Sequence, residues 1–179
     1  MLITVSGPPG SGTTTAAQRV AARLDLELVP GGQVFRAMAA ERGMSLPAFG
    51  RYVADHAEVD VELDTRLAAR AHKGGVVIES RLAGWIVRKE GLAALATWID
   101  CDARIRAQRV AEREGVPVER ALADNEERQR VERDRYLALY GIDMADLSVY
   151  DLVLDSGTLR PDAVAGQIVG AAETRFDST

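Results

Sequence analysis

The sequence is short of cysteine and histidine, and it has no long apolar run. A single cysteine, Cys101, cannot form an intramolecular disulfide, and sparse cysteine is typical of a reducing compartment. No apolar stretch approaches the roughly 18 residues that a transmembrane helix requires. The amino terminus lacks a basic leader, and a glycine-rich turn interrupts its apolar stretch after Ser6, which argues against a secretory signal. We therefore expect a cytoplasmic protein without a membrane partner.

Lysine is scarce too, and the choice of basic residues is uneven. Of the 22 basic residues only Lys73 and Lys89 are lysines, and the rest are arginines, whose planar guanidinium group binds phosphate bidentately. A GC-rich genome favours arginine codons and explains the same bias. The formal net charge of −5 makes a nucleic-acid polymer an unexpected partner. Composition alone leaves the function open, whereas the positions of the arginines can inform it.

Short apolar strands alternate with helices along the chain. Its 179 residues, 47% hydrophobic and 27% charged, suit a single globular domain over residues 1–179. We expect strands at residues 2–5, 26–29, 76–79, 95–100 and 152–155. We expect helices at residues 13–24, 34–42, 47–56, 59–73, 103–140 with a break near Gly115 and Pro117, and 160–172. The alternation predicts an α/β fold, a five-stranded parallel sheet with helices on both faces.

The segment from Gly7 to Thr14 matches the phosphate-binding pattern G-x-x-x-x-G-K-[ST] at every fixed position except one. It follows the first expected strand and opens the first expected helix. There the glycines let backbone N–H groups turn inward, and the helix terminus adds partial positive charge. We expect this loop to hold the phosphates of ATP, with Thr14 on Mg²⁺ and Thr15 near an adjacent phosphate. The expected ATP-binding residues are Gly7, Pro8, Pro9, Gly10, Ser11, Gly12, Thr13, Thr14 and Thr15.

Thr13 is the exception, because the pattern has a lysine there that reaches the β- and γ-phosphates. The departure leaves two alternatives open: a glycine-rich turn kept only for folding, or a regulatory protein that binds nucleotide without turnover. Two prolines and three consecutive threonines favour a phosphate loop. If the loop works, another cation must replace the lysine, and the arginines elsewhere are the expected source.

Three further segments resemble parts of the nucleoside monophosphate kinases of the P-loop superfamily. Residues 31–36 resemble the segment that opens the acceptor site, residues 76–81 the third strand, and residues 104–136 the arginine-rich lid. The resemblance implies that Arg36 and Arg81 grip the acceptor phosphate and that Glu79 organises Mg²⁺ through water.

The resemblance is nearest to the archaeal type of cytidylate kinase, and it extends over nearly the whole chain. The shared motifs are Gly10–Thr15, Val34–Arg36, Ser80–Trp85 and Arg135–Asp143. Threonine in place of the loop lysine is a familiar variant in that family. The likeness implies phosphoryl transfer from ATP to CMP, and to dCMP as well. It also implies an acceptor-binding segment at about residues 32–73 and a lid at about 115–136, both of which we expect to close on substrates.

Transfer between nucleotides needs alignment and neutralised charge more than covalent help. No general base is required, because the attacking phosphate oxygen is already ionised. Arg106, Arg109 and Arg113 have the spacing to share one helix face, as have Arg128 and Arg135. We expect Arg81, Arg109, Arg128 and Arg135 to act on the transferring group, although acidic neighbours make solvated surface an alternative for each lid arginine.

The base is not determined by the residues themselves. Asp64 is the candidate for contacting a pyrimidine edge, and Asp60, Glu62 and Arg66 have the same potential. AMP, UMP or a small alcohol such as shikimate remain alternative acceptors, although paired arginines favour a phosphorylated one. We expect a monomer.

Overall fold

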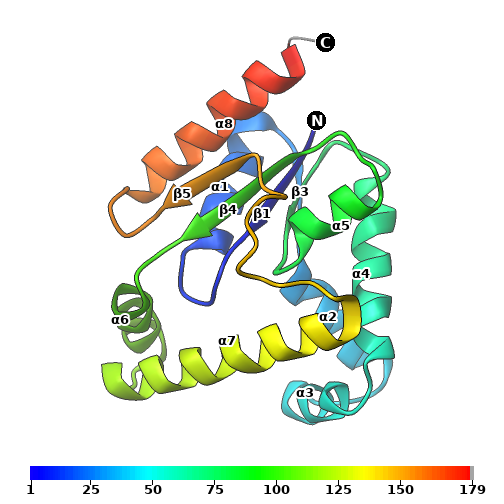
Figure 1. The fold of residues 1–179 in the computed structure, drawn as a ribbon, viewed down its shortest axis with the longest axis vertical. Helices are drawn as coiled ribbons and strands as arrows, with labels where there is room; N and C mark the ends of the chain where they lie inside the picture. The colour runs from blue at the N-terminus through cyan, green and yellow to red at the C-terminus, as the bar shows by residue number, and fades with distance from the viewer. Residues whose placement is uncertain (178–179) are drawn as a thin grey trace.

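A parallel sheet forms the centre of the molecule (Figure 1). The computed structural model describes residues 1–177, apart from the side chains of residues 46, 47 and 54. The strands are β1 (Leu2–Ser6), β2 (Glu27–Pro30), β3 (Val76–Glu79), β4 (Leu95–Asp100) and β5 (Leu152–Asp155). Their order is β2-β3-β1-β4-β5, and every neighbouring pair is parallel. The predicted five-stranded parallel sheet is confirmed.

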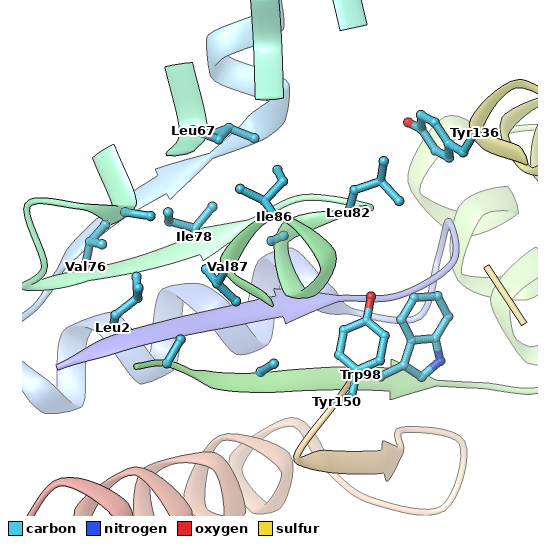
Figure 2. Close-up of a cluster of buried hydrophobic side chains, with 14 residues drawn as sticks. Leu2, Leu67, Val76, Ile78, Leu82, Ile86, Val87, Trp98, Tyr136 and Tyr150 are labelled. Atoms are coloured by element: carbon cyan, nitrogen blue, oxygen red, sulfur yellow. The ribbon is translucent and has the colours of Figure 1, made fainter. Parts of the chain in front are cut away.

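Helices cover both faces of the sheet. They are α1 (Thr13–Leu24), α2 (Gly31–Glu41), α3 (Leu46–Ala54), α4 (Glu58–Ala71), α5 (Ala83–Lys89), α6 (Ala103–Glu114), α7 (Val118–Tyr140) and α8 (Pro161–Asp177). On one face α1 and α8 pack together, with Val20 and Ile168 fully buried against the sheet. On the other face Leu67 of α4 and Val87 of α5 are fully buried in a second apolar cluster (Figure 2). None of the described helices is long and apolar enough to cross a membrane.

The central strands are buried on both faces, as their unbroken apolar runs predict. All of β1 is buried, and so are the first three residues of β3. Val5 pairs with Glu79, and Ser6 pairs with Trp98. The chain segments that follow β1 and β3 therefore leave the sheet side by side at its carboxyl edge, where ligands bind in open α/β sheets.

The structure corrects several predicted boundaries. α2 begins at Gly31, directly after β2, whereas the Pro-Gly-Gly run suggested a turn before a helix at residue 34. α8 continues to Asp177, beyond the predicted end at residue 172. The break near Gly115 and Pro117 is confirmed, because it divides the long arginine-rich stretch into α6 and α7.

α5 is a helix that the sequence pattern did not predict. It has only seven residues, and it is mostly buried, so it lacks the polar stripe of an amphipathic helix. A Cβ atom on Gly84 would lie 2.3 Å from the ring of Tyr150, which packs beside Trp98 (Figure 2). Glycine is therefore required at this position for close packing.

Candidate active site

The phosphate loop joins β1 to α1 at the carboxyl edge of the sheet. Gly10 and Gly12 have φ angles of 82° and 89°, which strain any other residue. Gly12 is the N-cap of α1, and no side chain caps the helix. The first amides of α1 are therefore left for an anion, which the helix dipole also favours.

The threonines at the start of α1 turn toward β3. The Thr13 hydroxyl donates to Glu79 Oε1 at 2.9 Å, and the Thr14 hydroxyl donates to the same oxygen at 3.4 Å. Thr13 thus holds the acidic residue of β3 rather than offering a charge of its own. Thr14 and Glu79, both lining the adjacent cavity, present the hard oxygen donors that Mg²⁺ prefers.

A cavity of about 640 Å³ opens beside the loop. Its walls come from the loop, the start of α2, α3, α4, the end of β3, and the lid helices α6 and α7. The lining residues are Pro9, Gly10, Thr13, Thr14, Gly31, Gly32, Phe35, Arg36, Gly50, Val53, Asp60, Leu63, Glu79, Ser80, Arg81, Arg113, Arg128, Glu132, Arg135 and Tyr136. Arginines from four different segments converge on it, which suits a ligand with several phosphate groups.

Glu132 of α7 ties two of these arginines together. Its Oε2 accepts from Nε of Arg81 at 3.0 Å, and its Oε1 accepts from Nε of Arg128 at 2.8 Å. Burial acts to raise the pKa of Glu132, but the two guanidinium groups outweigh it and hold that pKa below its usual range. The Nη groups of both arginines do not bond the carboxylate, so they can face a ligand.

Asp60 and Arg135 form a second charged pair on the wall. Asp60 Oδ2 lies 3.3 Å from Arg135 Nε, and the Asp60 side chain is only 6% exposed. The geometry does not make a hydrogen bond, so both atoms are buried without one. Burial raises the pKa of Asp60; attraction to Arg135 opposes the shift, and repulsion from Glu132 adds to it. A buried acid and a buried donor without hydrogen bonds are suited to meeting a polar ligand.

The structure brings most of the predicted site residues to this cavity. Arg36, Arg81, Arg128 and Arg135 line it, as do Thr14 and Glu79. Of the predicted loop set, Pro9, Gly10, Thr13 and Thr14 line the cavity, and the backbone of Gly7, Pro8, Ser11, Gly12 and Thr15 completes the turn and the start of α1. Arg36 is exposed and has no ion pair among the residues described.

Arg109 and Asp64 are not placed at the cavity. The Arg109 guanidinium group donates to Ser156 Oγ at 3.0 Å and to the Ser156 carbonyl at 2.7 Å, behind the loop. Asp64 is one helical turn beyond Asp60 and lines a different hollow, beside Lys89 and Tyr140. Of the three arginines expected to share a face of α6, Arg113 alone lines the cavity.

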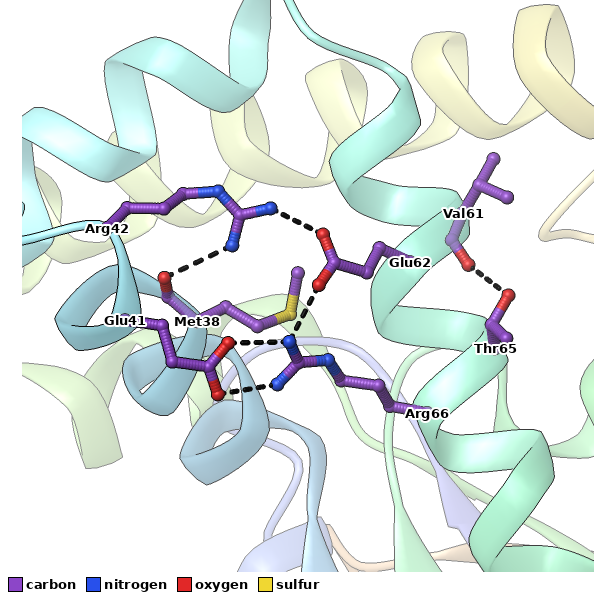
Figure 3. A network of polar contacts seen from close by, with 7 residues as sticks. All are labelled: Met38, Glu41, Arg42, Val61, Glu62, Thr65 and Arg66. Atoms are coloured by element: carbon purple, nitrogen blue, oxygen red, sulfur yellow. Dashed lines mark hydrogen bonds and ion pairs between the residues drawn. The ribbon is translucent and has the colours of Figure 1, made fainter.

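Glu62 and Arg66, two other candidates for the base, are used to join helices (Figure 3). Arg66 bonds both oxygens of Glu41 on α2 and also Glu62, and Glu62 in turn bonds Arg42. These contacts fasten α4 to α2 and to Arg42, which directly follows α2. They leave Asp60 as the acidic residue of α4 that lines the cavity.

Sequence reasoning missed the role of Glu132. In sequence Glu132 is one of the acidic neighbours of the lid arginines, whereas in the structure its side chain is 11% exposed and bridges Arg81 and Arg128. The spacing of four residues from Arg128 was the available signal, but the contact with Arg81 depends on the tertiary fold. Tyr136 and Leu63 also line the cavity without a local pattern that predicts it.

The fold, loop and arginine-lined cavity define a P-loop kinase. Among solved structures, an uncharacterised protein from Eubacterium ventriosum matches with a TM-score of 0.75 at 19% identity, covering 97% of this chain and 99% of that one. Shikimate kinase from Aquifex aeolicus matches with a TM-score of 0.59 at 16% identity over the whole of both chains. Likeness at this level establishes the fold.

The chain belongs to the cytidylate kinase-like family, whose model matches residues 2–158. It is 48% identical over 177 residues to the cytidylate kinase of Pyrococcus horikoshii, covering 99% of this chain and 90% of that one. It is 42% identical to the cytidylate kinase of Halorubrum lacusprofundi, covering 100% of this chain and 93% of that one. The resemblance to the archaeal enzymes is confirmed.

Proposed function

We propose that this protein transfers the γ-phosphoryl group of ATP to CMP, giving ADP and CDP, and that dCMP is a second acceptor. The observation that carries the proposal is the set of cavity arginines beside a phosphate loop. Binding of one nucleotide needs a single phosphate site. Transfer between two nucleotides needs a second phosphate site that faces the first. The cytidylate kinases of archaea are the relatives that supply the choice of base.

The residues divide the work between two substrates. The loop amides would hold the ATP phosphates, and Arg36 and Arg81 would hold the acceptor phosphate. Arg128 and Arg135, on α7, would approach the transferring group when the lid closes, so that negative charge is neutralised and water is excluded. The acceptor oxygen is already ionised, so these residues orient it and no proton needs to be removed.

Mg²⁺ would accompany ATP and neutralise charge on its phosphates. Thr14 would hold it, with Glu79 acting through water. No group of three or more acidic, histidine or cysteine side chains suited to a metal occurs among the described residues. That absence is compatible with Mg²⁺, which usually binds one or two protein oxygens together with substrate phosphates and waters.

Asp60 replaces Asp64 as our candidate for contacting the base. It lines the cavity on α4, on the acceptor side, and one of its oxygens is buried without a hydrogen bond. A carboxylate accepts from an exocyclic amino group, which cytosine has and uracil lacks. A cytoplasmic location and a monomeric state stay predictions.

The test is a coupled ADP-release assay with ATP–Mg²⁺ and CMP, dCMP, UMP, AMP or GMP as acceptor. We expect CMP to give the highest kcat/KM and Arg81→Ala to lower it by about a hundredfold or more. Arg120→Ala is the matched control, because Arg120 lies on α7 and its ion-pair partner among the described residues is exposed Asp124. A higher kcat/KM with another monophosphate would replace CMP as the proposed acceptor. Absence of turnover with all five acceptors would refute the proposal.

A further inference from the structure

The phosphate loop has an uncharged residue where its sequence pattern has a lysine. Thr13 occupies that position, its side chain is buried, and its hydroxyl is used by Glu79. The arginines of the cavity wall come from α2, the segment after β3, α6 and α7, and none belongs to the loop. The loop therefore needs positive charge from another segment of the chain.

Arg106 of α6 lies immediately behind the loop. Its Nη1 donates to the carbonyl of Pro9 at 3.1 Å, its Nε to the carbonyl of Cys101 at 3.0 Å, and its Nη2 to Gln129 Oε1 at 3.2 Å. The loop packs tightly on this residue, since a Cβ atom on Gly10 would lie 2.8 Å from the Arg106 carbonyl oxygen. The guanidinium group is thus fixed against the turn that leads into α1.

The charge of Arg106 is buried without a counter-ion. The residue is 6% exposed, all three hydrogen-bond acceptors are neutral, and no carboxylate of the described residues lies within ion-pair distance. Buried charges are ordinarily paired, because an isolated one is costly. Burial lowers the pKa of Arg106, attraction to Cys101, Asp100 and Asp102 opposes this, and repulsion from Arg81 adds to it. Arginine nevertheless stays charged at neutral pH.

We propose that Arg106 is a positioning residue that supplies, from behind the loop, the positive charge which the missing lysine would supply from the front. An anion on the loop amides would be attracted by this fixed cation and would relieve its repulsion with Arg81. Charges interact more strongly through the protein interior than through water, so the guanidinium group need not touch the phosphate. The inference rests on the proposed role of the loop as the ATP site.

Calorimetric titration with ATP–Mg²⁺ and, separately, with CMP tests the role of the charge. We expect Arg106→Gln to weaken ATP binding by about tenfold and CMP binding by less than about twofold, and Arg106→Lys to weaken ATP binding less than Arg106→Gln does. Thermal unfolding without nucleotide shows whether each variant is folded. Arg106→Met is the second neutral variant, because an apolar chain of similar length often replaces a buried charge without loss of stability. Arg19→Gln, at the exposed Asp162 pair, is the surface control.

Thr13→Lys provides a double-mutant cycle with Arg106→Gln. If Arg106 replaces the lysine, the new lysine should strengthen ATP binding by about fivefold more in the Arg106→Gln chain than in the unmodified chain. Equal gains in both backgrounds, or a parallel loss of ATP and CMP binding in the neutral variants, would show that Arg106 is only a structural support. An unmodified chain that binds CMP but not ATP would overturn both this inference and the proposed function.

Discussion

Glu132 of α7 and Asp60 of α4 are both buried acids on the wall of one cavity, yet burial has opposite outcomes for them. Glu132 touches two arginines, Arg81 and Arg128, and its pKa is lowered. Asp60 has one arginine beside it, without a hydrogen bond, and its pKa is raised. Asp64, one turn beyond Asp60, has no ion pair among the described residues, and burial raises its pKa to about 6.

The comparison indicates two different uses of an acid in this protein. With two cations in contact, Glu132 stays ionised and fixes Arg81, which follows β3, relative to Arg128 of α7. Asp60 and Asp64 of α4 touch one cation or none, and burial raises the pKa of both. Glu132 is therefore held ionised by two arginines, whereas Asp60 and Asp64 are not.

The largest effect should follow from Glu132→Gln. It leaves Arg81 and Arg128 without a counter-ion, so we expect the free energy of unfolding to fall by about 3 kcal/mol and kcat by at least about tenfold. The folded pKa of Glu132 is lowered, so its stabilising contribution is present above its unfolded value and is lost as pH falls through the folded pKa. The difference in urea unfolding between the two chains should therefore narrow in acid.

Glu127→Gln is the matched control on the same helix. Glu127 pairs with Arg130, and both side chains are more than half exposed. Its loss should leave the free energy of unfolding nearly unchanged, because an exposed ion pair contributes little to stability. An equal effect of the two substitutions would contradict the assignment of Glu132 as the fixed acid of the site.

Asp64→Asn should raise the free energy of unfolding at neutral pH, whereas Glu132→Gln should lower it. The pKa of Asp64 is raised from 3.8 to about 6, chiefly by burial, and Asp60, Lys89, Arg135 and Tyr140 are its charged or titratable neighbours. A raised pKa contributes stability that is present below the unfolded value and lost as pH rises through the folded one. Above pH of about 6 the neutral amide should therefore be more stable than the acid, by about 3 kcal/mol. Thermal unfolding of both chains below and above pH of about 6 should show that the extra stability of Asp64→Asn disappears in acid. If Asp64→Asn were less stable than the unmodified chain at neutral pH, the raised pKa of Asp64 would be contradicted.

Asp60→Asn separates binding from stability. We expect KM for CMP to rise by about tenfold, while the free energy of unfolding changes by less than about 1 kcal/mol, because the charge of Asp60 is already disfavoured by burial. KM for ATP should stay within about twofold. If CMP and UMP were used equally well by the unmodified chain, or if the substitution left KM for CMP unaltered, Asp60 would not contact the base.

The sheet and the loop could be predicted from sequence because their signals are local. Unbroken apolar runs identify buried strands, and the spacing of Gly7, Gly12 and Thr14 identifies the loop. The order of the strands and the short helix α5 could not be predicted, because they depend on packing such as the contact of Gly84 with Tyr150. A buried helix shows no polar stripe to reveal it.

The arginines illustrate the same limit within the candidate site. Helical spacing places Arg106, Arg109 and Arg113 on one side of α6, but it does not say what each one meets. The structure puts Arg106 behind the loop, Arg109 on Ser156 and Arg113 at the cavity. Partners contributed by distant segments distinguish them, and a single sequence does not contain that information.

Arg109→Gln should therefore lower kcat much less than Glu132→Gln does. Arg109 bonds Ser156, whose hydroxyl in turn donates to the carbonyl of Ser11 at 2.7 Å, so it braces the loop without facing the cavity. We expect a loss of about 1 kcal/mol in the free energy of unfolding and a fall in kcat of less than about threefold. Arg128→Gln, from an arginine that lines the cavity, should lower kcat more and stability less. The reverse ranking in steady-state kinetics would mean that the closed lid brings Arg109 to the transferring phosphate, as its position in the sequence first suggested.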